Sequence, residues 1–341
     1  MSKDEFGAPV LALETHPPSF RLRIDAAPIL DVRHLRVEYR IGRRRKLPAV
    51  SGVSFDIRRG EILGLIGESG CGKSSIARAV MQLPPPTSGK VLLEGEDLTT
   101  LPQKRLLRLR PKFQIIFQDS VSALNPRRRI GEAIAMPLHI TNSGRPSERR
   151  QRAREMMRQV GIDPENDSLR PFELSGGQCQ RVQIARALIT HPRLLICDEP
   201  VSSLDVSVQA QIINLLDALR CRYGLAMLFI SHDLAVVKNI CDRVAVMYMG
   251  RLCEIAASED LYHSPRHPYT ATLLDAVSRI DKPQALASGR TVGGIITPPE
   301  NPPQGCRFQQ ECKRKQRLCS ETEPEMKEVQ PGRRVACHYT L

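Results

Sequence analysis

The stretch Gly67-Glu-Ser-Gly-Cys-Gly-Lys-Ser74 decides the fold of this chain. It matches the pattern G-x-x-x-x-G-K-[ST] at every fixed position, and it stands between a compact apolar run (61–66) and a helical pattern (75–81). Glycines let the backbone turn so that its N–H groups converge on phosphate oxygens, and the following helix directs its positive dipole end at the same anion. The alternative is a glycine-rich turn that matches by chance, but such turns rarely join a strand to a helix.

The side chains of this phosphate loop complete the prediction. Lys73 brings a full positive charge to the β- and γ-phosphates, and Ser74 offers a hydroxyl to Mg²⁺, which prefers oxygen ligands. We therefore expect the motif and the residue after it to bind nucleotide, namely Gly67, Glu68, Ser69, Gly70, Cys71, Gly72, Lys73, Ser74 and Ser75.

A second apolar run, Leu194-Leu-Ile-Cys-Asp-Glu199, ends in two acids. Ligands of parallel α/β sheets bind at the carboxyl edge of the strands, so Asp198 is placed to bind Mg²⁺ and Glu199 to orient or deprotonate water. Phosphoryl transfer needs mainly positioning and charge neutralisation, for which these acids, one lysine and Mg²⁺ suffice. On its own, Asp-Glu-Pro after a strand is more often a turn, so this interpretation depends on the phosphate loop.

Similar apolar runs at 226–230 and 244–249 alternate with helical patterns, which predicts an α/β fold with a largely parallel sheet. We expect a proline-containing tail over 1–28, a folded body over 29–280, and a linker rich in proline and glycine over 281–303. The last segment, 304–341, holds four of the ten cysteines.

Composition narrows the function classes. The 50 Lys and Arg residues exceed the 37 Asp and Glu by 13, which favours anionic partners or simply a solvated basic surface. No apolar run approaches the roughly 20 residues of a membrane-spanning helix, and no secretory leader is evident, so we expect a cytosolic chain with thiols or metal ligands rather than disulfides. Only 4% aromatic residues are poor material for stacking nucleic-acid bases.

Between the phosphate loop and the acidic run lies Leu174-Ser-Gly-Gly-Gln178. A Ser-Gly-Gly before a helix can bind an anion, but on its own this motif is better explained as an ordinary capped helix start. Taken together, the ordered motifs resemble the nucleotide-binding subunit of an ABC transporter. Those motifs are the phosphate loop 67–74, Gln118, the signature 174–178, the Walker B run 194–198 with Glu199, the D-loop Ser203-Leu-Asp205, and His232 within Ser231-His-Asp233.

The resemblance implies an ABC-type P-loop ATPase domain over 29–280, with a mostly parallel core, an antiparallel β subdomain and a helical subdomain. It implies that two such domains sandwich two ATP molecules. The signature and D-loop would then contact the nucleotide held by the partner, through Ser175, Gly176, Gly177, Gln178 and Asp205.

The same resemblance assigns further roles around the nucleotide. Tyr39 would stack on adenine, and Gln118 would sense the γ-phosphate as a ligand of Mg²⁺ beside Ser74 and Asp198. His232 would bond the γ-phosphate and act with Glu199 and Gln118 in catalysis. Since no motif is degenerate, we expect a chain that hydrolyses ATP.

Finer features resemble one branch, the F-type ATPase subunit of dipeptide and oligopeptide (peptide/nickel) importers. They are Phe117-Gln-Asp119, Ser122-Ala-Leu-Asn-Pro126 and Ser264-Pro-Arg-His-Pro-Tyr-Thr270, with Ser120 where that branch usually has proline. The branch implies uptake of peptides or a related solute and a peripheral position on the cytoplasmic face of the inner membrane. Its partners would be a paralogous ATPase subunit, two membrane-spanning permeases and an extracytoplasmic substrate-binding protein, with no nucleic acid.

The last four cysteines are a separate question. Their spacing lacks the paired C-x-x-C of common zinc sites and the usual ferredoxin pattern. Gly305-Cys-Arg-Phe308 and Val335-Ala-Cys-His338 nevertheless resemble the C-terminal region of the branch, some members of which bind a [4Fe–4S] cluster. Zinc or reduced thiols packed in a small domain are the alternatives for the candidate ligands Cys306, Cys312, Cys319 and Cys337.

Two other functions stay open at this stage. A soluble ABC-type ATPase acting on DNA or ribosomes would share the motifs, although the usual second cassette, coiled coil or zinc insertion is absent from the sequence. A non-hydrolysing assembly subunit is the second alternative. Co-purification with permeases, or with ribosomes or DNA, distinguishes the first alternative from a transporter subunit. The rate of ATP hydrolysis distinguishes the second.

Overall fold

The computed structural model describes residues 27–42, 45–280 and 302–341. Nearly all of the predicted tail and linker lie outside the described residues. The strands, in chain order, are β1 (Leu30–Ile41), β2 (Arg45–Ile57), β3 (Ile62–Ile66), β4 (Ser88–Leu93), β5 (Glu96–Asp97), β6 (Phe113–Ile116), β7 (Leu194–Asp198), β8 (Ala226–Ile230), β9 (Arg243–Tyr248), β10 (Arg251–Ala257), β11 (Lys327–Gln330) and β12 (Arg333–Val335).

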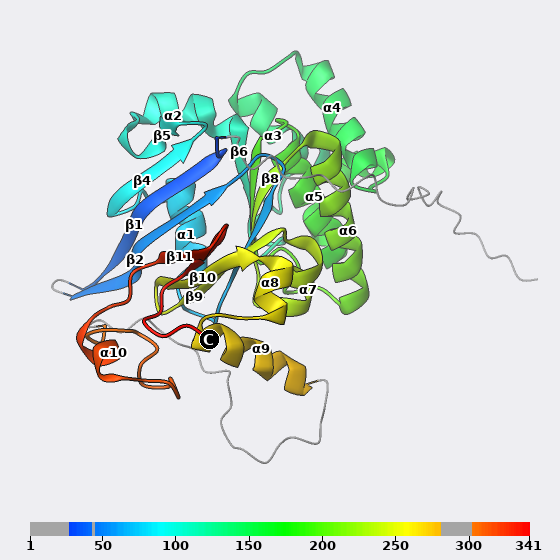
Figure 1. Ribbon diagram of the computed structural model, residues 1–341. Helices are drawn as coiled ribbons and strands as arrows, with labels where there is room; N and C mark the ends of the chain where they lie inside the picture. Colours follow the sequence, from blue (N-terminus) through cyan, green and yellow to red (C-terminus); the bar gives the residue numbers. More distant parts are fainter. Residues whose placement is uncertain (1–26, 43–44, 281–301) are drawn as a thin grey trace, which may run out of the picture.

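The helices lie between and after these strands (Figure 1). They are α1 (Lys73–Val80), α2 (Gln103–Leu109), α3 (Ile130–Ile140), α4 (Pro146–Gln159), α5 (Gly176–Leu188), α6 (Val206–Tyr223), α7 (Leu234–Ile240), α8 (Ser258–His263), α9 (Pro268–Ile280) and α10 (Arg317–Glu321).

Two sheets organise the described residues. Strands β2, β1, β4 and β5 form an antiparallel sheet in that order. The larger sheet has the order β11-β12-β10-β9-β3-β8-β7-β6, in which the run from β9 to β6 is parallel and β10, β12 and β11 are antiparallel. The predicted α/β class, with a mostly parallel core and an antiparallel β part, is confirmed.

The parallel strands are buried on both faces. Alternation along β3 places Ile62 and Ile66 in one hydrophobic cluster and Leu63 and Leu65 in another. Helices α3 to α7 contribute to the first cluster, while α1 and the antiparallel sheet contribute to the second, so the sheet is covered on either side (Figure 1). This continuous burial is why the strands read as uninterrupted apolar runs in the sequence.

The C-terminal segment joins the body through backbone pairing and a buried ion pair. Strand β12 pairs with β10, and Arg333 Nη2 lies 2.6 Å from the Glu254 carboxylate. The same carboxylate accepts the backbone N–H groups of Arg266 and His267. Phe308 belongs to the main hydrophobic cluster, so this segment adds to the existing core.

The buried imidazole of His267 makes a prediction about acid stability. Burial lowers its pKa to about 4, and its Nδ1 accepts the Tyr269 N–H at 3.0 Å. Between about pH 6.5 and pH 4, His267 is protonated in the unfolded chain but stays neutral in the folded chain. The free energy of unfolding therefore falls as the pH drops through this range, by about 1.4 kcal/mol per pH unit. We expect about 2 kcal/mol of loss between pH 7 and pH 5 from this group alone.

Urea unfolding at both pH values measures that loss. Carboxylates also titrate in this range, so the informative quantity is the difference between the wild type and His267→Gln, with exposed His263→Gln as the control. An identical pH dependence in wild type and His267→Gln would contradict the prediction.

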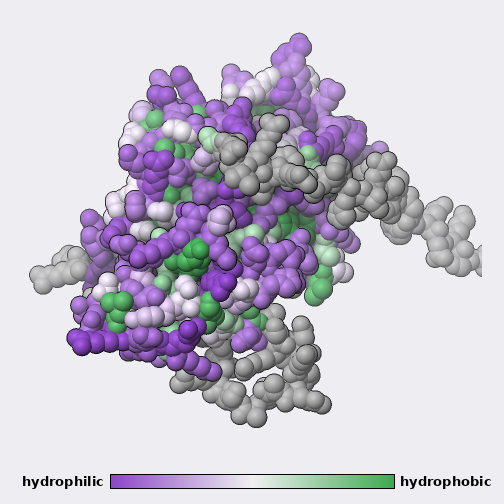
Figure 2. All heavy atoms as spheres, in the orientation of Figure 1, coloured by the Kyte–Doolittle hydropathy of each residue, from purple (hydrophilic) through white to green (hydrophobic). Residues whose placement is uncertain are grey.

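The surface seen in Figure 2 is predominantly hydrophilic, with hydrophobic residues in small separate patches. Within the described residues, no helix has the length and apolar character needed to cross a membrane.

Candidate functional site

The predicted phosphate loop joins β3 to α1 in a conformation that only glycine allows at two positions. Gly67 has φ 149° and Gly72 has φ 110°. A Cβ at Gly67 would lie 2.1 Å from the Met247 carbonyl oxygen, and one at Gly72 would lie 2.3 Å from the Ala49 carbonyl oxygen. The motif glycines are therefore required both by backbone angle and by the close approach of neighbouring strands.

The ammonium group of Lys73 lies inside this loop. Its Nζ donates to the carbonyl oxygens of Gly67 at 2.7 Å and Glu68 at 2.9 Å. The Cys71 side chain is buried beneath, and burial raises the pKa of its thiol. Ser69 and Gly70 form the exposed crest of the loop. The loop thus holds its cation centrally while its outer backbone faces solvent.

Ser74 and Asp198 form the point where α1 meets the end of β7. The Ser74 hydroxyl donates to Asp198 Oδ1 at 3.0 Å, and burial raises the pKa of the Asp198 carboxyl. A buried carboxylate beside a hydroxyl is a hard oxygen donor set, and Mg²⁺ typically takes only one or two protein carboxylates together with substrate phosphates. These two side chains therefore fit a magnesium ion that also binds a triphosphate.

Glu199 stands at the centre of the remaining predicted residues. Its Oε2 accepts Gln118 Nε2 at 2.8 Å and lies 3.4 Å from His232 Nδ1. Its backbone has φ 50°, a left-handed conformation that is strained for a residue other than glycine, and its N–H donates to Ile230 O at 3.0 Å. The segments after β6, β7 and β8 thus bring three predicted site residues together.

The signature is placed apart from this cluster. Ser175 caps α5 by accepting the Gln178 N–H at 3.3 Å, while Gln178 Oε1 accepts the Ser175 N–H at 2.9 Å. Ser175, Gly176 and Gln178 are exposed. In the described ranges, no hydrogen bond or ion pair joins the signature to the phosphate loop of the same chain.

The two other predicted nucleotide contacts lie on either side of the site. Tyr39, half-buried on β1, donates its hydroxyl to Ser75 Oγ at 3.2 Å, which places its ring beside the phosphate loop. Asp205 precedes α6 as its N-cap residue with an exposed side chain that makes no capping bond. Close packing at this end is shown by Gly177, where a Cβ would lie 2.7 Å from Val208 Cγ1.

The four C-terminal cysteines lie near one another in the described part of the chain. Burial raises the pKa of Cys306 to about 11, and the neighbouring thiols of Cys337, Cys319 and Cys312 also raise it, so the four lie in one region. Among the described residues, however, no three His, Cys, Asp or Glu side chains form a group that could hold a metal ion. The expectation of a [4Fe–4S] cluster is not supported by this geometry, and zinc is equally unsupported.

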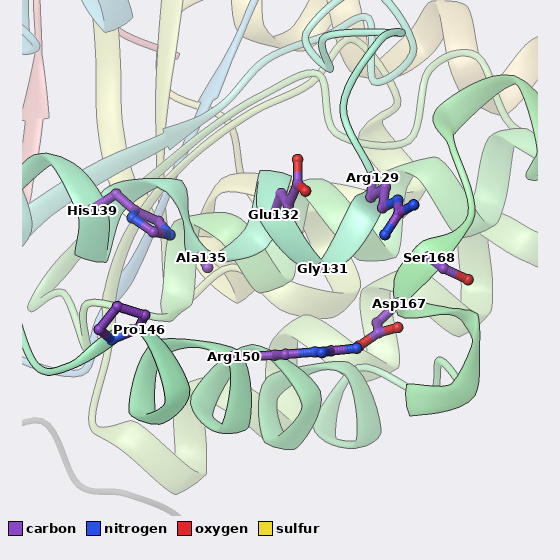
Figure 3. A pocket seen from close by; sticks show the side chains of 9 residues that line it. All are labelled: Arg129, Gly131, Glu132, Ala135, His139, Pro146, Arg150, Asp167 and Ser168. Carbon is purple, nitrogen blue, oxygen red and sulfur yellow. The ribbon is translucent and has the colours of Figure 1, made fainter.

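A pocket occurs elsewhere, between α3 and α4 (Figure 3). Arg129, Glu132 and His139 line it from α3 and its start, and Arg150 on α4 points towards Asp167 at 3.1 Å. It contains none of the predicted nucleotide residues. The predicted nucleotide residues range from buried, as Lys73 and Asp198 are, to exposed, as Ser69 and Gly70 are.

Two features of the site could not be predicted from the sequence. One is the left-handed backbone of Glu199, because no short motif marks φ at a glutamate. The other is Tyr269, whose hydroxyl accepts the N–H of Glu68 in the phosphate loop at 3.3 Å across 201 residues. The motif that contains Tyr269, residues 264–270, indicates the peptide-importer branch but does not predict so distant a contact.

Comparison with known families and relatives agrees with this geometry. Residues 50–202 match the family model "ABC transporter", and residues 253–319 match "Oligopeptide/dipeptide transporter, C-terminal region". A candidate peptide import ATP-binding protein of Brucella ovis is 48% identical over 310 residues, covering 91% of this chain and 97% of that protein. The oligopeptide transport ATP-binding protein OppF of Haemophilus influenzae is 43% identical, covering 92% and 97%.

Solved structures give the same result. A dimeric ATP-binding cassette in a post-hydrolysis state with ADP and Pi matches with TM-score 0.62 and 28% identity, covering 67% of this chain and 98% of that one. The cbiO1 protein of Clostridium perfringens, part of an ABC transporter complex, matches with TM-score 0.62 and 27% identity, covering 75% and 96%. The chain therefore belongs to the ABC transporter family of ATPases, in the branch that carries the oligopeptide/dipeptide transporter C-terminal region.

Proposed function

We propose that this chain is the ATP-hydrolysing subunit of an importer that takes up dipeptides, oligopeptides or a related solute. The observation that carries the proposal is the convergence of Gln118 and His232 on Glu199, next to the Ser74–Asp198 contact. The names of the Brucella and Haemophilus relatives, at 48% and 43% identity over nearly the whole chain, support the peptide class of solute.

In the proposed mechanism, Lys73 and the loop N–H groups hold the β- and γ-phosphates, while Ser74 and Asp198 hold Mg²⁺. Bound Mg²⁺ would neutralise charge that develops on the phosphate oxygens. Glu199 orients the attacking water and accepts its proton. Both the Gln118 amide and the His232 ring contact the Glu199 carboxylate and hold it in place.

The exposed signature suggests that a second ATPase chain completes each site. Ser175, Gly177 and Gln178 would contact ATP bound to that partner, and Asp205 would lie at the same interface. The N–H groups at the start of α5 and its positive dipole end suit a terminal phosphate. We propose a paralogous subunit as the partner, with homodimerisation as an outcome of the test below.

Replacing Ser175 with Arg tests this arrangement. We expect ATP to bind each chain almost normally, because Ser175 makes no contact with its own phosphate loop, while ATP-dependent pairing and turnover fall at least 100-fold. Equilibrium binding of a fluorescent ATP analogue, and sedimentation with ATP in the Glu199→Gln background, separate the two effects. Loss of ATP binding by the isolated Ser175→Arg chain would contradict a role across the interface.

The importer context adds membrane partners. We propose two permease subunits and an extracytoplasmic substrate-binding protein, with this chain peripheral on the cytoplasmic face. A pull-down in mild detergent with protein identification, and uptake of a labelled dipeptide by cells lacking the chain, test this proposal. Recovery of ribosomes or DNA in place of permeases would favour the alternative class of soluble ATPase. The proposal does not include a [4Fe–4S] cluster, because no metal-holding group occurs among the described residues.

A further inference from the structure

The inner side of the phosphate loop, at Gly67 and Cys71, contacts β9 and the turn between β9 and β10. The Gly250 N–H donates to the Cys71 carbonyl oxygen at 2.8 Å, and Gly67 lies against the Met247 carbonyl. The C-terminal segment contacts this turn from its other side, where Arg307 donates to the Met249 carbonyl oxygen. The turn is therefore a thin layer between the C-terminal segment and the loop.

Three aromatic rings continue this contact. The rings of Tyr248 and Tyr269 lie 4.6 Å apart, and each lies 5.4 Å from the ring of Phe308 in the C-terminal segment. The Tyr269 hydroxyl accepts the Glu68 N–H at 3.3 Å, and the Tyr248 hydroxyl donates to Glu311 Oε1 at 2.8 Å. Each tyrosine thus connects the aromatic cluster to one glutamate, Tyr269 on the loop side and Tyr248 on the C-terminal side.

The carboxyl groups of Glu68 and Glu311 are near enough for their charges to interact. Burial, followed by the charge of Glu311, raises the pKa of the Glu68 carboxyl, while Lys73 opposes the rise. Glu68 Oε2 is buried and, among the described residues, has no hydrogen-bond partner. A carboxylate that lacks a partner and faces another acid is costly, and the structure keeps it directly behind the phosphate loop.

We propose that Tyr269 and Glu311 are positioning residues of the phosphate loop, through which the C-terminal segment sets the affinity of the chain for ATP. Tyr269 fixes the first turn of the loop by holding the Glu68 N–H. Glu311, oriented by Tyr248, places a negative charge behind the loop that opposes the incoming triphosphate. This inference rests on the proposed ATP site, and it adds a segment more than 200 residues away in sequence to the control of that site.

The two positions make opposite predictions. Tyr269→Phe removes only the hydroxyl and is expected to weaken ATP binding about three- to tenfold, with kcat changed less than twofold. Glu311→Gln keeps an amide oxygen for the Tyr248 hydroxyl but removes the charge, so ATP binding is expected to tighten about two- to fourfold at low salt and to return towards wild type at 0.5 M salt. If Glu311 had only a structural role, Glu311→Gln would bind ATP as tightly as the wild type, or more weakly, at every salt concentration.

The experiment measures Kd for a fluorescent ATP analogue, together with KM and kcat for ATP, on the full chain. Tyr223→Phe, whose hydroxyl bonds Gln159 on α4, and Glu321→Gln, whose carboxylate pairs with Arg317 on α10, are the matched controls. Thermal midpoints within a few degrees of wild type establish that each variant is folded. Should Tyr269→Phe lose its fold, the salt-dependent sign of Glu311→Gln still decides.

Three outcomes are distinguishable. Weaker binding in Tyr269→Phe and tighter, salt-sensitive binding in Glu311→Gln support the inference. Kd values equal to those of the controls, or weaker ATP binding in Glu311→Gln, overturn the inference. In that case the proposed function still stands, provided that the wild type binds ATP and Lys73→Ala abolishes the binding. A wild-type chain that binds no ATP, or binds it as well after Lys73→Ala, overturns the proposed function itself.

Discussion

Replacing Glu199 with Gln is expected to lower kcat for ATP hydrolysis about 10³-fold and to leave the Kd for ATP within about threefold of wild type. The amide can still form a hydrogen bond with Gln118, but it cannot accept a proton from water. ATP binding should be affected little, because the contacts of Lys73 and the Ser74–Asp198 hydrogen bond involve no atom of Glu199. Single-turnover phosphate release and binding of a fluorescent ATP analogue measure the two quantities.

The control for this prediction is Glu155→Gln, the same change at an exposed position on α4. It should leave kcat unaltered. Turnover by Glu199→Gln equal to that of the control would remove Glu199 from catalysis and would favour an assembly subunit that does not hydrolyse ATP. Loss of ATP binding in Glu199→Gln would instead indicate that the Glu199 carboxylate also contributes to holding the nucleotide.

Much of the site could be predicted because its chemistry is local. The phosphate loop is eight consecutive residues, and its glycines are needed by backbone angle, so a short pattern carries the information. Asp198 and Glu199 follow an apolar run whose burial on both faces makes it recognisable as a central strand. The carboxyl-edge rule then brought Asp198 to Ser74 without any knowledge of the sheet order.

Contacts that depend on the three-dimensional path of the chain were inaccessible. Tyr269 contacts Glu68 across 201 residues and Glu311 contacts Tyr248 across 63, and no short sequence pattern predicts either contact. The pairing of β12 with β10 is equally distant in sequence. The cysteines show the converse problem. The resemblance of two short motifs around Cys306 and Cys337 implied a cluster, with zinc or reduced thiols as alternatives, although the spacing matched no common metal pattern. Ligand convergence depends on side-chain directions, and the described residues form no such group.

The second large effect is expected from the buried pair Arg333–Glu254. Both side chains are almost wholly inaccessible, at 5% and 0% exposed, and their atoms lie 2.6 Å apart. Replacing Arg333 with Met leaves the Glu254 carboxylate buried with only the backbone N–H groups of Arg266 and His267, so we expect a loss of about 3–5 kcal/mol in the free energy of unfolding. Urea unfolding at pH 7 measures this loss.

Arg334→Met is the matched control, because Arg334 pairs with Asp56 at 2.8 Å where both side chains are more than a quarter exposed. That pair should contribute at most about 1 kcal/mol. Equal effects of the two substitutions would contradict the burial argument. Because Arg333 lies on β12, its loss should also loosen the C-terminal segment, which carries Glu311, against β10. Arg333→Met should then shift ATP affinity in the direction of Glu311→Gln. A destabilised Arg333→Met chain with unchanged ATP affinity would place the effect in β12 alone and would separate the stability of the C-terminal segment from its action on the phosphate loop.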